Sequence, residues 1–313
     1  MRIVYMGSPD FAVLPLNRLL EAGHEVPAIY SQPDRPRQRG KQLSPTPVKA
    51  RGLELGIPVY TPEKINAPEV LEQLRALQAE LFVVVAYGQF LSEELFTMPP
   101  LGCINIHASL LPAYRGAAPI HWAILNGESR TGVSIMYIDK GMDSGDVLLC
   151  RETEIGPEEE TGSLHDRLRE IGAELLLDAV EALESGTAQR RPQDHAAASY
   201  APLLKKEHEI IDWSRPARAI HDQIRGLSPW PGCHSTWQGK RLKIRASRVL
   251  EQESDAAPGT ILSADKQGLT VACGQGCLLL QQLQPEGKAL MDAAAFVRGY
   301  HPAPGEKLGG EKP

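Results

Sequence analysis

Residues 103–119 read CINIHASLLPAYRGAAP, and the other parts of the chain can be placed around this stretch. Its first four residues alternate as a strand should, and they follow Gly102 after a Met-Pro-Pro loop. Asn105 and His107 stand two positions apart, so on a strand their side chains point to the same face. The amide can donate a hydrogen bond, and the imidazole can gain or lose a proton near neutral pH. This pair suits a reaction that builds charge on a carbonyl oxygen while an amine loses a proton.

Two carboxylates follow in a glycine-rich turn, residues 141–146, with the sequence GMDSGD. Either Asp143 or Asp146 could reach back to orient the imidazole of His107 and stabilise its charged form. The spacing does not decide between them. An asparagine and a histidine at a strand edge are more often hydrogen-bonded structural residues than catalytic ones. A catalytic role for the pair therefore needs support from the neighbouring sequence.

That support comes from the segment after His107. Residues 109–116, SLLPAYRG, resemble the SLLPxxRG loop of folate-dependent formyltransferases, and Asn-x-His stands directly before it as in that family. Asp143 lies at the position of the family's catalytic aspartate, in the matching GMDSGD turn. The resemblance implies that Asn105, His107 and Asp143 are catalytic. It also implies folate contacts by the loop residues Ser109, Leu110, Leu111 and Pro112.

The amino-terminal residues predict an α/β fold. Residues 2–6 read as a buried strand that ends at Gly7, and Ser-Pro-Asp then opens a helix with apolar positions at helical spacing. A dinucleotide fingerprint needs G-x-G-x-x-G here, and the predicted second strand, residues 26–30, is not followed by a ribose-binding acid, so NAD binding is not expected. The βα alternation predicts a doubly wound, mostly parallel Rossmann-like sheet, which the resemblance identifies as the formyltransferase fold.

A run of apolar residues, 81–86, predicts a central strand that is buried on both faces. Tyr87, Gly88 and Phe90 follow at its carboxyl end, where open α/β sheets bind ligands. By analogy with the resembled family, we expect the backbone at these residues to line the folate pocket.

Residues 32–49, QPDRPRQRGKQLSPTPVK, form a loop in which five Lys or Arg residues accompany one acid. The composition fits a solvated surface loop as well as a segment that orders against a polyanion. The loop resembles the insertion that the methionyl-tRNA formyltransferase family uses on the tRNA acceptor stem. The resemblance implies tRNA contacts by Arg37, Arg39 and Lys41, with Arg39 as the key arginine.

The chain changes character after residue 188. Arginine, proline and small residues predict a linker over residues 189–206, between a catalytic domain, 1–188, and a second domain, 207–313. In the second domain, a helix and about five short strands with glycine turns predict a small OB-like β-barrel. The resemblance implies that this domain binds tRNA. Residues 305–313 are expected to fray.

Charge is unevenly distributed along the chain. The formal net charge of −6 argues against nucleic-acid binding by the whole surface, yet residues 205–248 contain ten Lys or Arg and four Asp or Glu, a local balance of +6. Lys243 and Arg245 belong to a predicted strand, residues 241–249, in which cations alternate with apolar residues. Such a face is either simply solvated or a track for RNA phosphates, and the basic loop favours the second interpretation.

Other features narrow the class of protein. No run of ~18 apolar residues and no secretory signal is present, so we expect a cytoplasmic protein without a membrane segment. The five scattered cysteines do not form a disulfide framework, and Cys273 and Cys277, around Gly-Gln-Gly, predict a hairpin turn rather than a metal site. We expect a monomer that needs no metal.

The resemblance covers nearly the whole chain and implies a specific reaction. A formyl group would pass from 10-formyltetrahydrofolate, the formyl donor, to the α-amine of methionine on initiator methionyl-tRNA, in support of translation initiation. Asn105 would donate to the oxyanion, His107 would stabilise it or relay the proton, and Asp143 would hold the imidazole and accept or pass on the amine proton. A covalent mechanism through Ser109 is a rival, although no GxSxG elbow surrounds that serine.

Two alternative functions remain open from the sequence. Sugar-nucleotide N-formyltransferases share the Asn-x-His, SLLP and aspartate pattern, but they would not need a basic loop or a cationic barrel. A non-catalytic RNA-binding protein would not need Asn105, His107 and Asp143 together.

Overall fold

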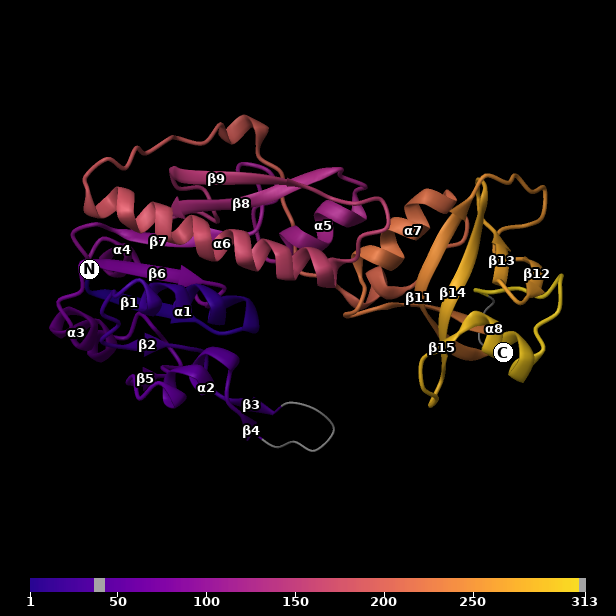
Figure 1. Cartoon of the computed structure of the whole chain (residues 1–313), viewed down its shortest axis with the longest axis horizontal. Coiled ribbons are helices and arrows are strands. Elements are labelled where there is room, and N and C mark those ends of the chain that lie inside the picture. Colours follow the sequence, from indigo (N-terminus) through magenta and orange to yellow (C-terminus); the bar gives the residue numbers. More distant parts are fainter. Residues whose placement is uncertain (37–42, 310–313) are drawn as a thin grey trace. The chain divides into compact units, whose positions relative to one another are not determined.

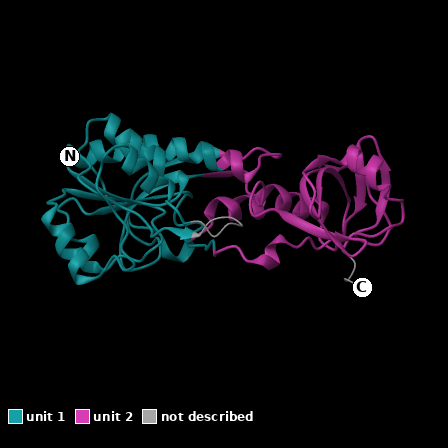
Figure 2. Cartoon of the chain, turned by 90° about the horizontal axis from the view of Figure 1, so that it is seen from below, with its two compact units in different colours: residues 1–116, 132–153, 165–201 teal, residues 117–131, 154–164, 202–313 magenta. Residues whose placement is uncertain are grey.

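The computed structural model of the chain describes residues 1–36 and 43–309 (Figure 1). The chain forms two compact units, which Figure 2 colours separately. Unit 1 comprises residues 1–116, 132–153 and 165–201, and unit 2 comprises residues 117–131, 154–164 and 202–313. The segment predicted as a linker, residues 189–206, is divided after Ala201, and its larger part belongs to unit 1.

Unit 1 is built on a seven-stranded sheet. The strands are β1 (Ile3–Gly7), β2 (Ile29–Tyr30), β5 (Val59–Tyr60), β6 (Leu81–Val85), β7 (Cys103–His107), β8 (Arg130–Tyr137) and β9 (Val147–Glu154). Their order is β5-β2-β1-β6-β7-β8-β9; the first five pair in parallel, and β8 pairs antiparallel with β7. Every residue of β1 and β6 is buried, as is typical of apolar strands that are covered on both faces.

Helices cover both faces of this sheet. They are α1 (Val13–Glu21), α2 (Pro47–Glu54), α3 (Pro68–Ala76), α4 (Glu93–Phe96) and α6 (Thr161–Glu184), with short 3-10 helices η1 (Asp10–Ala12) and η2 (His195–Ala197). On one face, Leu74 of α3 joins Met6 and Phe82 in a buried cluster. On the other face, Gly172 of α6 lies so near β7 that a Cβ there would be 3.0 Å from Ile106. The predicted doubly wound, mostly parallel α/β sheet is confirmed.

The second strand is shorter than predicted. The sequence indicated residues 26–30, whereas β2 contains only Ile29 and Tyr30. Pro27 has no amide hydrogen and cannot donate to a strand ladder, so regular pairing begins after it.

The basic loop is carried by a short hairpin. Strands β3 (Arg35–Pro36) and β4 (Leu43–Ser44) pair antiparallel, and the Lys49 ammonium group lies 2.7 Å from the Asp34 carboxylate. One cation of the loop is thereby neutralised within the protein. The residues for which tRNA contacts were predicted, Arg37, Arg39 and Lys41, lie outside the described residues.

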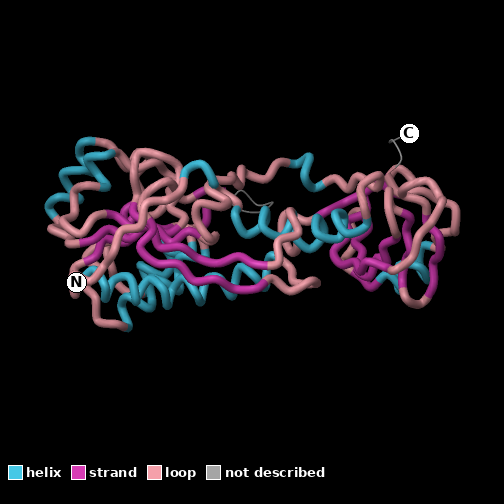
Figure 3. The backbone as a smooth tube through the Cα atoms, turned by 90° about the horizontal axis from the view of Figure 1, so that it is seen from above, coloured by secondary structure: helices cyan, strands magenta, loops and turns pink. Residues whose placement is uncertain are grey.

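Unit 2 contains an antiparallel sheet with the strand order β10-β11-β14-β13-β12, and β15 pairs with β14. Figure 3 draws the strands of the chain in magenta. The strands are β10 (Cys233–Trp237), β11 (Lys240–Leu250), β12 (Ile261–Asp265), β13 (Gly268–Ala272), β14 (Cys277–Pro285) and β15 (Met291–Asp292). The helices are α5 (Pro119–Leu125), η3 (Lys206–Glu209), α7 (Ala217–Gly226) and α8 (Ala293–Tyr300). The hairpin predicted between Cys273 and Cys277 is confirmed, because the Cys273 amide donates to the Gly276 carbonyl at 3.0 Å.

The carboxyl-terminal segment joins the two edges of this sheet. Trp237 of β10 forms an antiparallel bridge with Leu308, and Thr260, directly before β12, forms one with Lys307. Leu308 is 3 % exposed and belongs to the core of unit 2. The expectation of fraying is therefore wrong for residues 305–309, because apolar burial and backbone pairing offset the entropy cost of ordering them.

We expect that Leu308→Ala lowers the free energy of unfolding by about 2–5 kcal/mol, the usual cost of truncating a buried leucine. The matched control is Leu290→Ala, because Leu290 is 45 % exposed and its truncation should change stability by about 0.5 kcal/mol or less. Chemical denaturation of both variants tests this prediction. Equal stabilities of the two variants would contradict the conclusion that residues 305–309 join the two edges of the sheet of unit 2 and stabilise it.

No helix in residues 1–36 and 43–309 has the length and apolar character needed to cross a membrane. Among these described residues, no group of three or more His, Cys, Asp or Glu side chains is placed to hold a metal ion.

Candidate active site

Strand β7 brings Asn105 and His107 to the carboxyl end of the sheet. Asn105 lies opposite Val84 of β6, and His107 lies opposite Ser134 of β8. His107 is 5 % exposed, whereas Asn105 is half-buried. The Asn105 amide forms no hydrogen bond with the residues that the structure describes, so it is available to a ligand.

Two oxygen atoms determine how His107 can carry protons. Its Nε2 atom is 2.9 Å from the carbonyl oxygen of Tyr114, and because a carbonyl can only accept, Nε2 carries the hydrogen and donates it. Its Nδ1 atom is 3.6 Å from Oδ2 of Asp143. In the neutral ring, Nδ1 bears a lone pair that faces the carboxylate, and a proton added there creates an ion pair. Nδ1 is therefore the atom at which this imidazole can take a proton.

The structure places Asp143, rather than Asp146, beside His107. The Asp143 side chain is 20 % exposed, so this carboxylate is accessible although the imidazole is buried. Its Oδ2 atom also accepts a hydrogen bond from the Gly116 amide at 2.8 Å. Asp146 takes part in the sheet through its backbone carbonyl, which accepts from the Tyr137 amide at 2.9 Å.

The turn that presents Asp143 is tight and strained. Asp143 has a φ of +48°, in the left-handed region that is costly for residues other than glycine. Gly145 leaves no room for a side chain, since a Cβ there would lie 1.9 Å from a backbone carbonyl oxygen of β8. Within the turn, Oδ1 of Asp139 accepts from the Gly141 amide at 3.0 Å. These constraints restrict the backbone of the turn that carries Asp143.

The loop at residues 109–116 is fixed by internal hydrogen bonds and by β8. The Ser109 hydroxyl donates to the Ala113 carbonyl at 2.6 Å, and the Leu111 amide donates to the Ser134 hydroxyl at 3.1 Å. The peptide bond between Leu111 and Pro112 is cis. Because Ser109 is 1 % exposed and its hydroxyl is engaged, its position favours a structural role over that of a nucleophile. Half-buried surfaces remain on Leu110, Leu111 and Pro112.

Tyr87 can face a ligand only through its backbone. Its side chain is 1 % exposed within the core of unit 1, and this burial raises the pKa of its hydroxyl above the ordinary value. Its carbonyl oxygen accepts from the Ser8 hydroxyl at 3.2 Å and from the Gln32 amide group at 3.0 Å. These bonds join the segments that follow β1, β2 and β6 at the carboxyl end of the sheet.

Gly88 and Phe90 are more open. Gly88 is exposed and has a φ of +88°, and the Phe90 side chain is 71 % exposed. Phe90 lines a surface hollow of about 680 Å³ together with residues 64–69. Of the predicted folate contacts in this segment, Phe90 is therefore the side chain with the most accessible surface.

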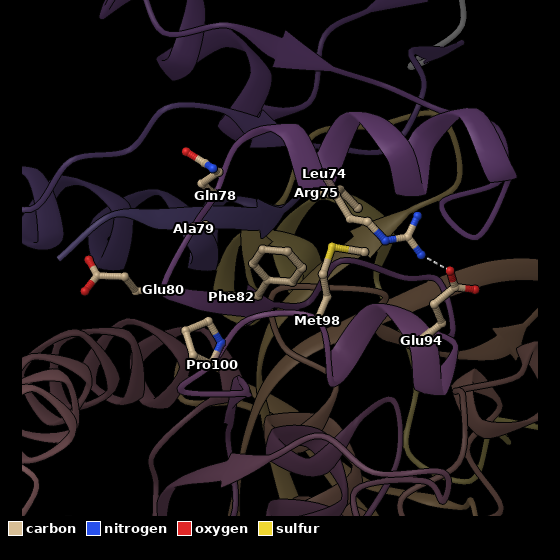
Figure 4. Close-up of a pocket in the computed structure, with 9 residues that line it drawn as sticks. All are labelled: Leu74, Arg75, Gln78, Ala79, Glu80, Phe82, Glu94, Met98 and Pro100. Carbon is tan, nitrogen blue, oxygen red and sulfur yellow. Dashed lines mark hydrogen bonds and ion pairs between the residues drawn. The ribbon is translucent and has the colours of Figure 1, made fainter.

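Another hollow of unit 1, of about 470 Å³, is lined by residues that include Leu74 and Phe82 (Figure 4). It lies beside α3, where Arg75 pairs with Glu94 at its rim. Its residue Phe82 lies opposite Cys103, the first residue of β7, whereas His107 is the last residue of that strand. The hollow is thus at the amino end of these strands, where α/β sheets do not bind ligands.

The predicted cations of unit 2 lie on β11, but strict alternation ends within that strand. Lys243 is half-buried between buried Leu242 and buried Ile244, as the alternation predicts. After Ile244 the pairing with β14 shifts by one residue, so Arg245 occupies a β-bulge. Its Nη1 atom is buried and has no hydrogen-bond partner among the described residues. Of these two cations, Lys243 is therefore the one that follows the alternation of the strand.

Comparison with known proteins identifies the class of protein. The model of the formyl transferase family matches residues 1–180, and the model of the formyl transferase C-terminal domain matches residues 203–301. The two matches define the class of protein as a formyl transferase that has the formyl transferase domain and the C-terminal domain. The chain is also 50 % identical over 309 residues to methionyl-tRNA formyltransferase from Moorella thermoacetica, covering 99 % of each chain. The chain belongs to the methionyl-tRNA formyltransferase family.

Two solved structures are similar in fold alone. HypX from Aquifex aeolicus, in complex with tetrahydrofolic acid, is 18 % identical with a TM-score of 0.64; the match covers 98 % of this chain and 48 % of that one, so this chain spans about half the length of HypX. An N-formyltransferase from Helicobacter canadensis, in complex with folinic acid and dTDP-3-aminofucose, is 18 % identical with a TM-score of 0.66, over 89 % of this chain and 98 % of that one.

The sequence did not indicate two backbone groups of this site, the Tyr114 carbonyl and the Gly116 amide. Gly116 has a φ of +116°, and a Cβ there would be 2.9 Å from the Ala201 carbonyl oxygen. The glycine after Arg115 could have indicated a position without room for a side chain. Its contact partners, Asp143 and Ala201, are distant in the sequence, so the sequence alone could not identify them.

Proposed function

We infer that the chain transfers the formyl group of 10-formyltetrahydrofolate to the α-amine of methionine on initiator methionyl-tRNA, in support of translation initiation. The observation that carries this function is the identity of 50 % with a methionyl-tRNA formyltransferase over nearly the whole of both chains. An amide, an imidazole and a carboxylate at the carboxyl end of one sheet supply the groups that formyl transfer requires.

Asn105, His107 and Asp143 have separate roles in this proposal. The Asn105 amide donates to the formyl oxygen as the amine attacks the carbonyl carbon and negative charge develops on that oxygen. The hydrogen on Nε2 of His107 is held by Tyr114, so any proton passes through Nδ1, which faces Asp143. Asp143 orients the imidazole, stabilises its charged form, and accepts or passes on the proton that the amine loses.

The folate site in this proposal lies between two loops that leave neighbouring strands. Leu110, Leu111 and Pro112, after β7, offer half-buried apolar surface, and Ser109 keeps their loop in shape. After β6, the backbone of Tyr87 and Gly88 and the side chain of Phe90 border the site. Parallel strands β6 and β7 end at the same edge of the sheet, which is where such a fold binds its ligands.

The tRNA site in this proposal uses cations from two separate segments. Arg37, Arg39 and Lys41 belong to the basic loop, and Lys243 and Arg245 belong to β11. We assign catalysis to residues 1–188 and tRNA binding to residues 207–313, with residues 189–206 between them. We place the reaction in the cytoplasm, where initiator tRNA is used, and we expect a monomer with a mass in solution near 34.2 kDa.

One assay tests the acceptor directly. The protein is incubated with 10-formyltetrahydrofolate and with charged initiator tRNA, charged elongator tRNA or an amino-sugar nucleotide. We expect rapid formylation of the initiator methionyl-tRNA. Formylation of the amino-sugar nucleotide alone would overturn the proposed acceptor, and the absence of any formyl transfer would favour a non-catalytic RNA-binding protein.

We expect the KM for tRNA to rise steeply with ionic strength while the KM for the folate changes little, because phosphate contacts release counterions. Lys243→Ala should reduce the slope of log KM for tRNA against log salt by roughly 0.7–0.9, the effect of about one lost phosphate contact. Lys266→Ala is the matched control, because Lys266 is exposed in the turn between β12 and β13. If the KM for tRNA did not change with salt, or if the two variants had equal slopes, the proposed phosphate contact of Lys243 would be contradicted.

A further inference from the structure

The segment between the two family matches, residues 181–202, contains residues that lie against the candidate active site. Gln193 is 9 % exposed, and its Nε2 atom donates to the carbonyl oxygens of Asp143, at 2.9 Å, and Gly145, at 2.7 Å. One side-chain amide thus holds the backbone of the strained turn on both sides of Ser144.

The other end of the same amide holds the loop that follows His107. Oε1 of Gln193 accepts from Nε and Nη2 of Arg115, at 3.1 and 2.7 Å, and Arg115 is 4 % exposed. A guanidinium can only donate and a carbonyl can only accept, so the orientation of the Gln193 amide is unambiguous. Gln193 therefore connects the loop at residues 109–116 to the turn at residues 141–146.

The backbone on both sides of Arg115 is tied to the same segment. The Tyr114 amide donates to the Ser199 hydroxyl at 2.9 Å, the Arg115 amide donates to the Ser199 carbonyl at 2.9 Å, and the Ala201 amide donates to the Arg115 carbonyl at 2.7 Å. Residues 193–201 thereby fix the position of the Tyr114 carbonyl, which holds Nε2 of His107.

We propose that Gln193 is a positioning residue for formyl transfer, which acts by holding Asp143 at the correct distance from His107. The proposal rests on the catalytic role proposed for Asp143. Asp143 has a left-handed backbone conformation, which is uncommon for residues other than glycine, and the Gln193 amide donates to its carbonyl oxygen. A misplacement of about 1 Å at a reacting group can lower the rate by about 10²-fold. The hydrogen bonds between Gln193 and the turn at residues 141–146 therefore affect turnover as well as stability.

Two substitutions distinguish the contribution of the Gln193 amide nitrogen from that of its oxygen. Gln193→Glu keeps the size of the side chain and the contact with Arg115, but it turns a carboxylate oxygen toward the carbonyls of Asp143 and Gly145. Gln193→Met keeps the volume and removes both contacts. We expect kcat to fall about 10–100-fold in each variant. The KM values for folate and tRNA should change much less, and the pH profile of kcat should shift, because the geometry of the pair formed by Asp143 and His107 has changed.

Gln223→Met is the matched control. Gln223 is also buried, and its Nε2 atom also donates to two backbone carbonyls, those of His208 and Ile210, at 2.8 and 3.0 Å in unit 2. Oε1 of Gln223 has no hydrogen-bond partner among the described residues, whereas Oε1 of Gln193 accepts from Arg115, so Gln223→Met should lose somewhat less thermal stability than Gln193→Met while it retains kcat and its pH profile. An equal loss of kcat in both methionine variants would overturn the proposal, because the effect of Gln193 would then reflect general destabilisation.

A double-mutant cycle distinguishes this inference from the proposed function. In the Asp143→Asn background, Gln193→Glu should lower kcat by less than about twofold, because the group through which Gln193 acts is already lost. A full 10–100-fold loss in that background would overturn the positioning role and leave the role of Asp143 intact. Normal activity of Asp143→Asn alone would instead overturn the proposed catalytic role of Asp143, and this inference with it. Wild-type kcat in Gln193→Glu would overturn the inference only.

Discussion

Replacing Asn105 with alanine is expected to lower kcat for formyl transfer by about 10²–10³-fold, the usual cost of losing one oxyanion donor. The Asn105 amide is half-buried at the end of β7, on the same face as His107, and forms no hydrogen bond with the other described residues. Its removal should therefore affect the transition state more than the fold. Single-turnover formylation of initiator methionyl-tRNA, with saturating folate, is the measurement.

Asn105→Asp and Asn17→Ala complete this test. The aspartate keeps the shape of the side chain but replaces the donor with a negative charge, so it should be at least as inactive as the alanine variant. Asn17 lies on α1, where its side-chain oxygen accepts from Nε of Arg51 at 2.8 Å, and its truncation should leave kcat unchanged. Near-normal turnover of a folded Asn105→Ala variant would exclude the proposed oxyanion role.

Replacing Asp143 with asparagine is expected to lower kcat by about 10²–10⁴-fold, the range typical of general acid–base catalysis. Asparagine can still accept the hydrogen bond from the Gly116 amide, so the loop should keep its shape. It cannot accept the amine proton or form an ion pair with an imidazolium at Nδ1 of His107. The pH profile of kcat for the variant and the wild type is the measurement.

Asp146→Asn is the matched control, because Asp146 belongs to the same turn and contributes its backbone carbonyl to the sheet. This variant should retain kcat within about threefold, since surface or turn substitutions outside a site usually have small effects. If the Asp146 variant were inactive and the Asp143 variant active, the assignment of the two carboxylates would be reversed.

Local patterns in the sequence were sufficient to predict much of the fold. The continuous apolar run at residues 81–86 predicted a central strand, because a strand covered on both faces needs apolar residues at every position. The predicted strand at residues 241–249 lies within β11, which contains residues 240–250. The two-residue period placed Asn105 and His107 on one face of β7, because successive side chains of a strand alternate.

By itself, the sequence determined the class of fold, the strand that carries Asn105 and His107, and the turn that contains the candidate carboxylates, because these follow from periodicity and from residues close in the chain. Only the tertiary structure decided which aspartate lies beside His107, how residues 305–309 join the sheet of unit 2, and that Gln193 holds a turn fifty residues before it in the chain. Such contacts depend on where the backbone returns after many residues, and no local pattern records that path.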